Sequence, residues 1–142
     1  DSRARFVATP FREAASLPTP DLPFILNTGR IRDQWHTMTR TGKIDKLMKR
    51  TQTQTIEIHS NDARLMGISE GDMVVVKSAR AEVCVSAVLT NDIREGTVFM
   101  SFHHGDMFAP GQAANNLTSN ALDPISREPE YKACAVMISK LN

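Results

Sequence analysis

The sequence predicts a mainly β fold in which six strands form a small closed barrel. Six short segments are rich in β-branched residues and alternate apolar with polar positions, as strands buried on one face do. Only one short segment carries the end signals of a helix. The 142 residues suffice for one hydrophobic core. Closing the sheet into a barrel would remove the exposed edges that six short strands otherwise leave.

The predicted elements follow one another from residue 23 onward. The helix is expected at 60–67, where Ser60 or Asn61 would cap its start and Gly67 would end it in a left-handed conformation. Two long polar loops, 28–50 and 103–131, would leave the barrel. The six strands are predicted at 24–27, 53–58, 73–78, 82–89, 98–102 and 134–139.

Residues 1–22 differ from the rest because they contain Pro10, Pro18 and Pro20 and show little periodicity. We expect them to form an extended lead-in or linker segment, followed by one domain at 23–142. The first residue is Asp1, so we expect the chain to be part of a longer protein. No run could span a membrane and no signal-peptide pattern opens the chain, so no membrane partner is expected.

The net charge of +1 is unevenly distributed along an otherwise ordinary globular composition of 41% hydrophobic and 23% charged residues. Residues 30–50 hold seven basic and two acidic residues, which gives +5 there and leaves −4 for the remainder. This patch would suit an anionic partner or a solvated loop, and charge alone favours the solvated loop. Cys84 and Cys134 are expected to be buried free thiols, which fits a reducing compartment.

The stretch 27–43 has little hydrophobic periodicity, and so long a polar segment in a compact domain is usually functional or disordered. Gly29 lets the backbone approach a ligand closely, and Arg30 offers a planar cation that matches phosphate. The hydroxyl groups of the threonines at 28, 37, 39 and 41 could donate hydrogen bonds to a ligand. Trp35 could stack on a pterin or purine ring or pack beneath the loop, and both alternatives stay open.

The sequence predicts no catalytic assembly and no metal site. Paired carboxylates and a Ser/His/Asp arrangement are not visible, and the cysteines and histidines lack metal-ligand spacing. We expect His103 and His104 to be loop or surface histidines. Residues 116–118 match the N-glycosylation pattern, which we interpret as accidental because no secretory signal accompanies it.

Several motifs together resemble a known family. The run Leu26-Asn27-Thr28-Gly29-Arg30, continued by Gln34-Trp35-His36-Thr37, is similar to the start of the C-terminal molybdopterin-dinucleotide-binding domain of the dimethyl sulfoxide reductase superfamily. That superfamily includes nitrate reductases and formate dehydrogenases. Later segments agree and keep the family's order. They are a turn and strand at 67–76, a late cofactor loop at 115–118 and 123–126, and a closing strand at 130–136.

The resemblance implies a six-stranded double-psi β-barrel with short helices and long cofactor-facing loops. It implies that the parent enzyme binds the cofactor molybdenum bis(molybdopterin guanine dinucleotide). The cofactor would lie between this domain and the remaining domains of the parent enzyme, and those domains are the other expected partners. An iron–sulfur cluster and the metal ligand would lie upstream, so this chain would hold no catalytic or metal-binding residue. The implied cofactor-binding residues are Thr28, Gly29, Arg30, Gln34, Trp35, His36, Thr37, Phe102, Asn115 and Lys132.

The stretch 29–42 is most similar to assimilatory, cytoplasmic nitrate reductases, so the parent is expected to reduce nitrate to nitrite. Formate dehydrogenases share the ending Pro129-Glu130-Tyr131-Lys132 and are the first alternative. A stand-alone barrel that acts as an interaction or nucleic-acid-binding module is the second, motivated by the basic segment. We expect no nucleic-acid partner, because aromatic residues are poorly interleaved with the basic ones. Without ligand, residues 28–43 are expected to be mobile.

Overall fold

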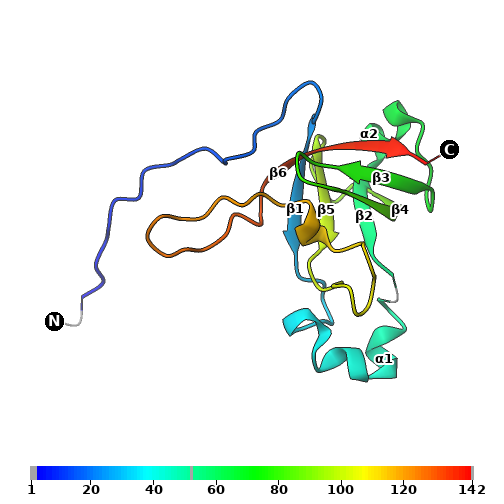
Figure 1. Ribbon diagram of the computed structural model, residues 1–142, viewed down its shortest axis with the longest axis horizontal. Coiled ribbons are helices and arrows are strands. Elements are labelled where there is room, and N and C mark those ends of the chain that lie inside the picture. Colours follow the sequence, from blue (N-terminus) through cyan, green and yellow to red (C-terminus); the bar gives the residue numbers. More distant parts are fainter. Residues whose placement is uncertain (1–2, 52, 142) are drawn as a thin grey trace.

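The chain folds into a six-stranded barrel with an extended N-terminal arm, in a computed structural model that describes residues 3–51 and 53–141 (Figure 1). Every predicted strand is present, with ends shifted by at most two residues. The strands are β1 (Phe24–Gly29), β2 (Thr55–His59), β3 (Met73–Lys77), β4 (Glu82–Thr90), β5 (Thr97–Ser101) and β6 (Cys134–Lys140).

The strand order around the closed barrel is β1-β5-β2-β4-β3-β6. β1 lies parallel to β5 and β2 lies parallel to β4, whereas the other neighbouring pairs are antiparallel. This is the expected fold class, a mainly β double-psi barrel, which is therefore confirmed. Because β1 and β5 run in the same direction, the loops that follow both strands leave the barrel at the same end.

Alternation along the strands builds the barrel interior. In β2, Ile56 and Ile58 are fully buried while Glu57 between them is only partly buried. Each such apolar side chain stabilises the fold by roughly 1.5–3 kcal/mol relative to an exposed one. The interior is completed by Leu26, Val74, Val76, Val83, Val85, Ala87, Val98, Met100, Val136 and Ile138.

The predicted helix is α2 (Ser60–Met66), and Gly67 ends it with a φ of 66°, as expected. Its start differs from the prediction, because neither Ser60 nor Asn61 is the cap. The Nδ1 atom of His59 accepts a hydrogen bond of 3.1 Å from the backbone N–H of Asn61. Histidine is not a usual capping residue, and His59 ends β2, so its sequence position indicates a strand.

The predicted loops contain more regular structure than expected. Segment 28–50 holds two one-turn 3-10 helices, η1 (His36–Met38) and η2 (Thr41–Lys43), and the short helix α1 (Asp45–Met48). The late loop holds η3 (Ala114–Asn116). Elements of three or four residues span about one turn, which is too short for hydrophobic periodicity to reveal them.

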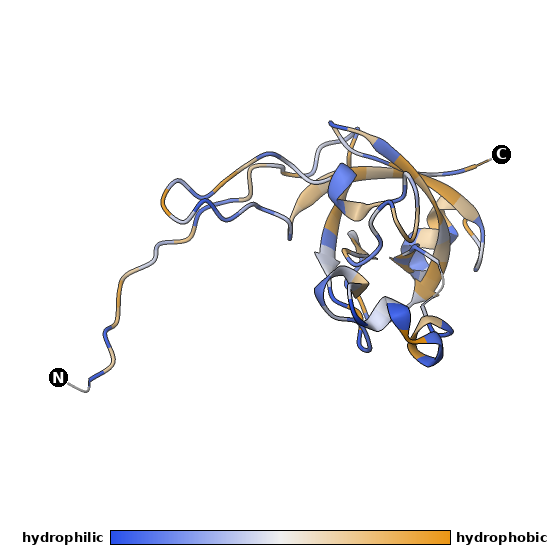
Figure 2. Ribbon diagram, turned by 60° about the horizontal axis from the view of Figure 1, so that its bottom comes forward, coloured by the Kyte–Doolittle hydropathy of each residue, from blue (hydrophilic) through white to orange (hydrophobic). Residues whose placement is uncertain are grey.

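The arm at 3–22 is extended and lies beside a second extension formed by the late loop (Figure 1). The backbone N–H of Ala15 donates to Glu130 Oε2 at 2.9 Å, and Ser16 Oγ accepts from the N–H of Ala135 at 2.9 Å. Figure 2 shows both segments projecting from a barrel whose strands are coloured mostly as hydrophobic. No helix between residues 3 and 51 or between 53 and 141 has the length and hydrophobicity to cross a bilayer.

Both cysteines are free thiols. Cys134 is buried, its Sγ donates to the carbonyl oxygen of Leu117 at 3.1 Å, and burial raises the pKa of this thiol. Cys84 is only partly buried, so the prediction of burial is wrong for this residue. Its neighbours Val83 and Val85 take the inward positions of β4, which leaves Cys84 on the outer face.

Candidate functional site

Two parallel strands place the first part of the candidate site. Gly29 ends β1 opposite Ser101, which ends β5. The pairing continues one step further, because the N–H of Phe102 donates to the carbonyl oxygen of Gly29 at 3.1 Å. The loop after β1 and the segment that begins at Phe102 are thereby held together at one end of the barrel.

Lys132 joins this end from far along the chain. Its Nζ donates to the carbonyl oxygen of Thr28 at 2.6 Å, across 104 residues of sequence, and lies 5.4 Å from the centre of the Phe102 ring. Thr28 is buried, and its Oγ1 donates to the carbonyl oxygen of Tyr131 at 2.6 Å. Two hydrogen bonds therefore connect the end of β1 to the segment before β6, and they place a cation there.

Arg30, Trp35 and His36 lie together in the loop after β1. The Arg30 guanidinium lies 5.5 Å from the centre of the Trp35 ring, and the rings of Trp35 and His36 are 5.4 Å apart. Trp35 is 57% exposed, so the alternative that it packs beneath the loop is wrong. A cavity of about 380 Å³ is lined by Arg30, Trp35, His36, Thr37, Phe102 and His103.

The backbone of this loop makes a left-handed turn. His36, Thr37 and Met38 have φ values of 43°, 52° and 61°, a conformation that is unfavourable for residues other than glycine. Met38 is fully buried and anchors the turn. Consecutive strained residues persist only where the surroundings impose them, and they are concentrated at functional sites.

The threonine hydroxyl groups do not offer the free donors that the sequence suggested. Thr37 and Thr39 both donate to the carbonyl oxygen of His36, at 2.7 and 2.6 Å. Thr41 donates to Gln34 Oε1 at 2.5 Å, and Thr28 donates to the backbone as described above. All four protons are used inside the protein and Thr28 is buried, so only the oxygens of Thr37, Thr39 and Thr41 are left to accept hydrogen bonds from a ligand.

Gln34 and Asn115 are not brought together with the other predicted residues. Gln34 is buried, and its Nε2 donates to Thr51 Oγ1 at 3.3 Å while its Oε1 accepts from Thr41, so it braces the loop from within. Asn115 is exposed in η3. Within the described part of the chain, the lining of the cavity beside Trp35 includes neither residue.

His103 and His104 are buried, which contradicts a surface position for them. Burial lowers the pKa of both imidazoles, and the neighbouring charges of His104 and Arg30 lower that of His103 further. Neither ring nitrogen of His103 has a hydrogen-bond partner within the described residues. The sequence offered no signal for this burial beyond two histidines at the end of a strand.

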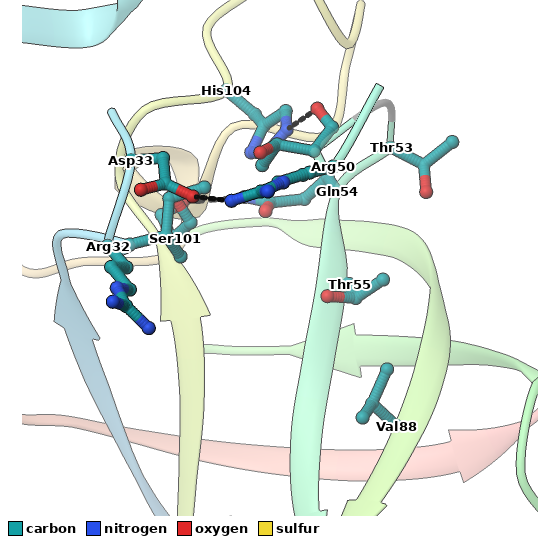
Figure 3. A pocket seen from close by; sticks show the side chains of 11 residues that line it. Arg32, Asp33, Arg50, Thr53, Gln54, Thr55, Val88, Ser101 and His104 are labelled. Carbon is teal, nitrogen blue, oxygen red and sulfur yellow. Dashed lines mark hydrogen bonds and ion pairs between the residues drawn. The ribbon is translucent and has the colours of Figure 1, made fainter. Parts of the chain in front are cut away.

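A second cavity, of about 400 Å³, lies on the side of His104 (Figure 3). Gln54 is buried there and donates through Nε2 to the carbonyl oxygen of Ser101 at 2.7 Å. Arg50 and Asp33 form an ion pair of 3.2 Å across its rim. The sequence motifs pointed to neither Arg50 nor Gln54. Over the described ranges, no three His, Cys, Asp or Glu side chains are grouped closely enough to hold a metal ion.

Comparison with known families identifies the domain that carries these loops. Residues 24–135 match the family described as "Molydopterin dinucleotide binding domain". The chain belongs to this family. The expected relationship to the dimethyl sulfoxide reductase superfamily is thereby confirmed.

Relatives of this domain occur in several molybdoenzymes. The F420-dependent formate dehydrogenase subunit alpha of Methanocaldococcus jannaschii is 40% identical over 99% of this chain. The nitrate reductase of Symbiobacterium thermophilum and the periplasmic nitrate reductase of Desulfovibrio desulfuricans are each 37% identical over the same share. The chain spans only 20%, 18% and 18% of these three proteins.

Among solved structures, acetylene hydratase from Pelobacter acetylenicus shares the fold, with a TM-score of 0.75 over 92% of this chain and 21% of that chain. The sequences are only 15% identical, so this likeness concerns the fold alone.

Proposed function

We propose that this domain binds a molybdopterin guanine dinucleotide cofactor of a larger molybdenum oxidoreductase, with the end of β1 and β5 as one wall of the site. The supporting observation is that eight of the ten residues implied by the sequence motifs meet at that end, although they come from segments up to 104 residues apart. They are Thr28, Gly29, Arg30, Trp35, His36, Thr37, Phe102 and Lys132.

The chemistry of these side chains fits a dinucleotide. Arg30 and Lys132 supply cations suited to phosphate oxygens, and Trp35 and Phe102 supply ring faces and edges for a flat heterocycle. Gly29 lets the backbone approach the ligand, because no side chain projects there. When bound, the molybdenum–pterin group would supply the redox chemistry, while these residues bind and orient it.

The test of this site measures cofactor content. We expect that Arg30→Ala and Lys132→Ala, made in the full-length natural protein, each lower bound guanine nucleotide and molybdenum several-fold, since each removes a charge-assisted contact. Arg64→Ala is the matched control, because Arg64 is exposed on α2. Full cofactor content in both site variants would refute the proposed site.

The proposal also includes a substrate for the parent enzyme. We favour nitrate, reduced to nitrite, because 29–42 is most similar to assimilatory nitrate reductases, and formate oxidation is the alternative because a formate dehydrogenase subunit is 40% identical. Assays of the full-length enzyme with nitrate and with formate discriminate between them. Formate oxidation without nitrate reduction would exclude the first choice.

We also propose a role for the N-terminal segment, a place for the iron–sulfur cluster and a location for the enzyme. Residues 1–22 would connect the domain to the rest of the enzyme, an iron–sulfur cluster would lie in another domain, and the enzyme would be cytoplasmic. The competing hypothesis, a stand-alone nucleic-acid-binding barrel, rests on the charge of 30–50. It predicts salt-dependent binding of RNA or DNA by the isolated domain, and we expect none.

A further inference from the structure

His103 is a buried polar side chain whose ring makes no hydrogen bond to residues 3–51 or 53–141. It is 1% exposed, and both of its ring nitrogens lack a partner among the described residues. Buried donors and acceptors are nearly always paired, because an unpaired group loses its hydration and gains nothing in return. An imidazole with two unpaired nitrogens is therefore a candidate for a group that is paired only when a ligand is present.

The position of His103 favours this interpretation. The ring contacts Phe102 edge to face, with centroids 4.8 Å apart, and it lines the same cavity as Arg30 and Trp35. His103 follows β5, whereas Arg30 and Trp35 follow β1. The parallel pairing of these strands therefore delivers His103 to the proposed cofactor site.

The charge state of His103 suits a hydrogen bond to an electron-rich ligand. Burial and the nearby Arg30 and His104 lower its pKa, so the ring is neutral at pH 7 and carries one N–H donor and one acceptor nitrogen. Lys132, close to the Phe102 ring, adds another cation. A ligand with phosphate or ring oxygens would be attracted to this positive region and could accept the imidazole N–H.

We propose that His103 donates a hydrogen bond directly to the dinucleotide cofactor in the cavity beside Phe102. This inference rests on the proposed function and adds a residue that the motif resemblance did not include. The ring nitrogens are covered before binding, so a covering side chain must move. Arg30, Trp35, His36 and Thr37 line the same cavity and are exposed, so these side chains can move without losing buried contacts.

The test compares His103→Phe with His103→Gln and with the control His104→Phe, all in the full-length natural protein. Phenylalanine keeps a flat ring but cannot form hydrogen bonds, whereas glutamine keeps a donor and an acceptor. His104 is the matched control because it is equally buried and adjacent, but lines the second cavity and has its Nε2 3.4 Å from the carbonyl oxygen of Thr51. The readouts are acid-released guanine nucleotide, molybdenum content, and the melting temperature of the cofactor-free protein.

We expect His103→Phe to release cofactor up to about tenfold faster, the loss that corresponds to one hydrogen bond. The melting temperature of its cofactor-free form should stay the same or rise, since two unpaired buried nitrogens are removed. The rate of cofactor release from His103→Gln should lie between those of His103→Phe and the unmodified protein. His104→Phe should retain cofactor like the unmodified protein. Weaker cofactor binding together with an unchanged or higher melting temperature would not be expected if His103 only served packing.

Three outcomes would overturn the inference. Unchanged cofactor retention in His103→Phe, together with losses in Arg30→Ala and Lys132→Ala, would reject His103 and leave the proposed function intact. Unchanged retention in all three variants would reject the proposed function as well. Equal losses of cofactor and of melting temperature in His103→Phe and His104→Phe would assign both histidines to packing.

Discussion

Gly29 occupies a position at the candidate site where there is no room for a Cβ atom. A Cβ built on this residue would lie 2.6 Å from Cε2 of Phe99 and 3.8 Å from Nζ of Lys132. The first distance is far below a normal contact, and Phe99 sits in β5, the strand that pairs with β1. The requirement for glycine therefore comes from packing within the barrel as well as from access to a ligand.

We expect Gly29→Ala to lower the free energy of unfolding by about 1–3 kcal/mol, the usual cost of overpacking. Urea denaturation of the two proteins measures this difference. Gly105→Ala is the control, because a Cβ there meets no atom within 4 Å, and it should change stability by less than about 0.5 kcal/mol. Equal effects of the two substitutions would contradict the packing argument.

The buried histidines make stability depend on pH. The pKa values of His103 and His104 are lowered in the folded state, so the unfolded chain binds more protons once the pH falls below about 6.5. Their contribution is complete above that value and is lost progressively as the pH falls toward the lowered folded pKa values. We expect the free energy of unfolding to decrease from pH 7 to pH 5.

Urea titrations at several pH values check this expectation. The double variant His103→Phe/His104→Phe should flatten the dependence between pH 7 and 5. Asp72 and Asp123 also have lowered pKa values, because of Lys140 and of hydrogen bonds from Ser126, but they act near pH 4 and below. If the free energy of unfolding of the double variant changed between pH 7 and 5 as much as that of the unmodified protein, other groups would cause the pH dependence.

At the scale of elements, the polar segment between β1 and β2 is held by a few internal contacts. Gln34 connects η2, through Thr41, with Thr51 before β2, and the buried Met38 anchors η1. The exposed residues of the segment carry its positive charge. Because few contacts tie it to the barrel, we expect it to exchange backbone amide hydrogens much faster than the strands when no ligand is bound.

Gln34→Ala should increase exchange and tryptic cleavage within 28–50, since it removes the hydrogen bonds of Gln34 with Thr41 and Thr51. The melting temperature of the barrel should change little, because the barrel core does not include Gln34. Hydrogen exchange with mass spectrometry measures the local effect, and Trp35→Ala, an exposed neighbour, is the control. Slow exchange across 28–43 in the ligand-free protein would contradict the expected mobility.

At the scale of the whole molecule, one interior unites all six strands. Leu26 is fully buried in β1, which pairs with β5 on one side and with β6 on the other. We expect Leu26→Ala to lower the free energy of unfolding by about 2–5 kcal/mol, through lost burial and the cavity that remains. Circular dichroism and tryptophan fluorescence both follow this transition.

The two probes report on different parts of the molecule. Circular dichroism reports the barrel, whereas the single tryptophan, Trp35, reports the loop after β1. If the loop follows the barrel, both midpoints shift together in Leu26→Ala. A fluorescence midpoint that stays unchanged while the circular dichroism midpoint moves would show that the loop unfolds independently of the core.

Local patterns in the sequence were enough to predict the barrel strands and the family. Short apolar runs rich in β-branched residues, several of which alternate with polar ones, mark the strands, and Gly67 marks the end of α2, because these features depend on neighbours only a few residues away. The threonine and tryptophan motif was also enough to direct attention to the loop after β1. Its one-turn helices escaped prediction because they are shorter than the periodicity on which such predictions depend.

Contacts between distant segments could be seen only in the folded barrel. Parallel pairing of β1 with β5 brings His103 to Arg30, and closure through β6 brings Lys132 to Thr28. The fold also buries His103 and His104, and the internal turns use the threonine protons in hydrogen bonds. Burial and hydrogen-bond pairing are properties of the assembled surface, because they depend on which groups exclude water from which others, and sequence spacing does not contain that information.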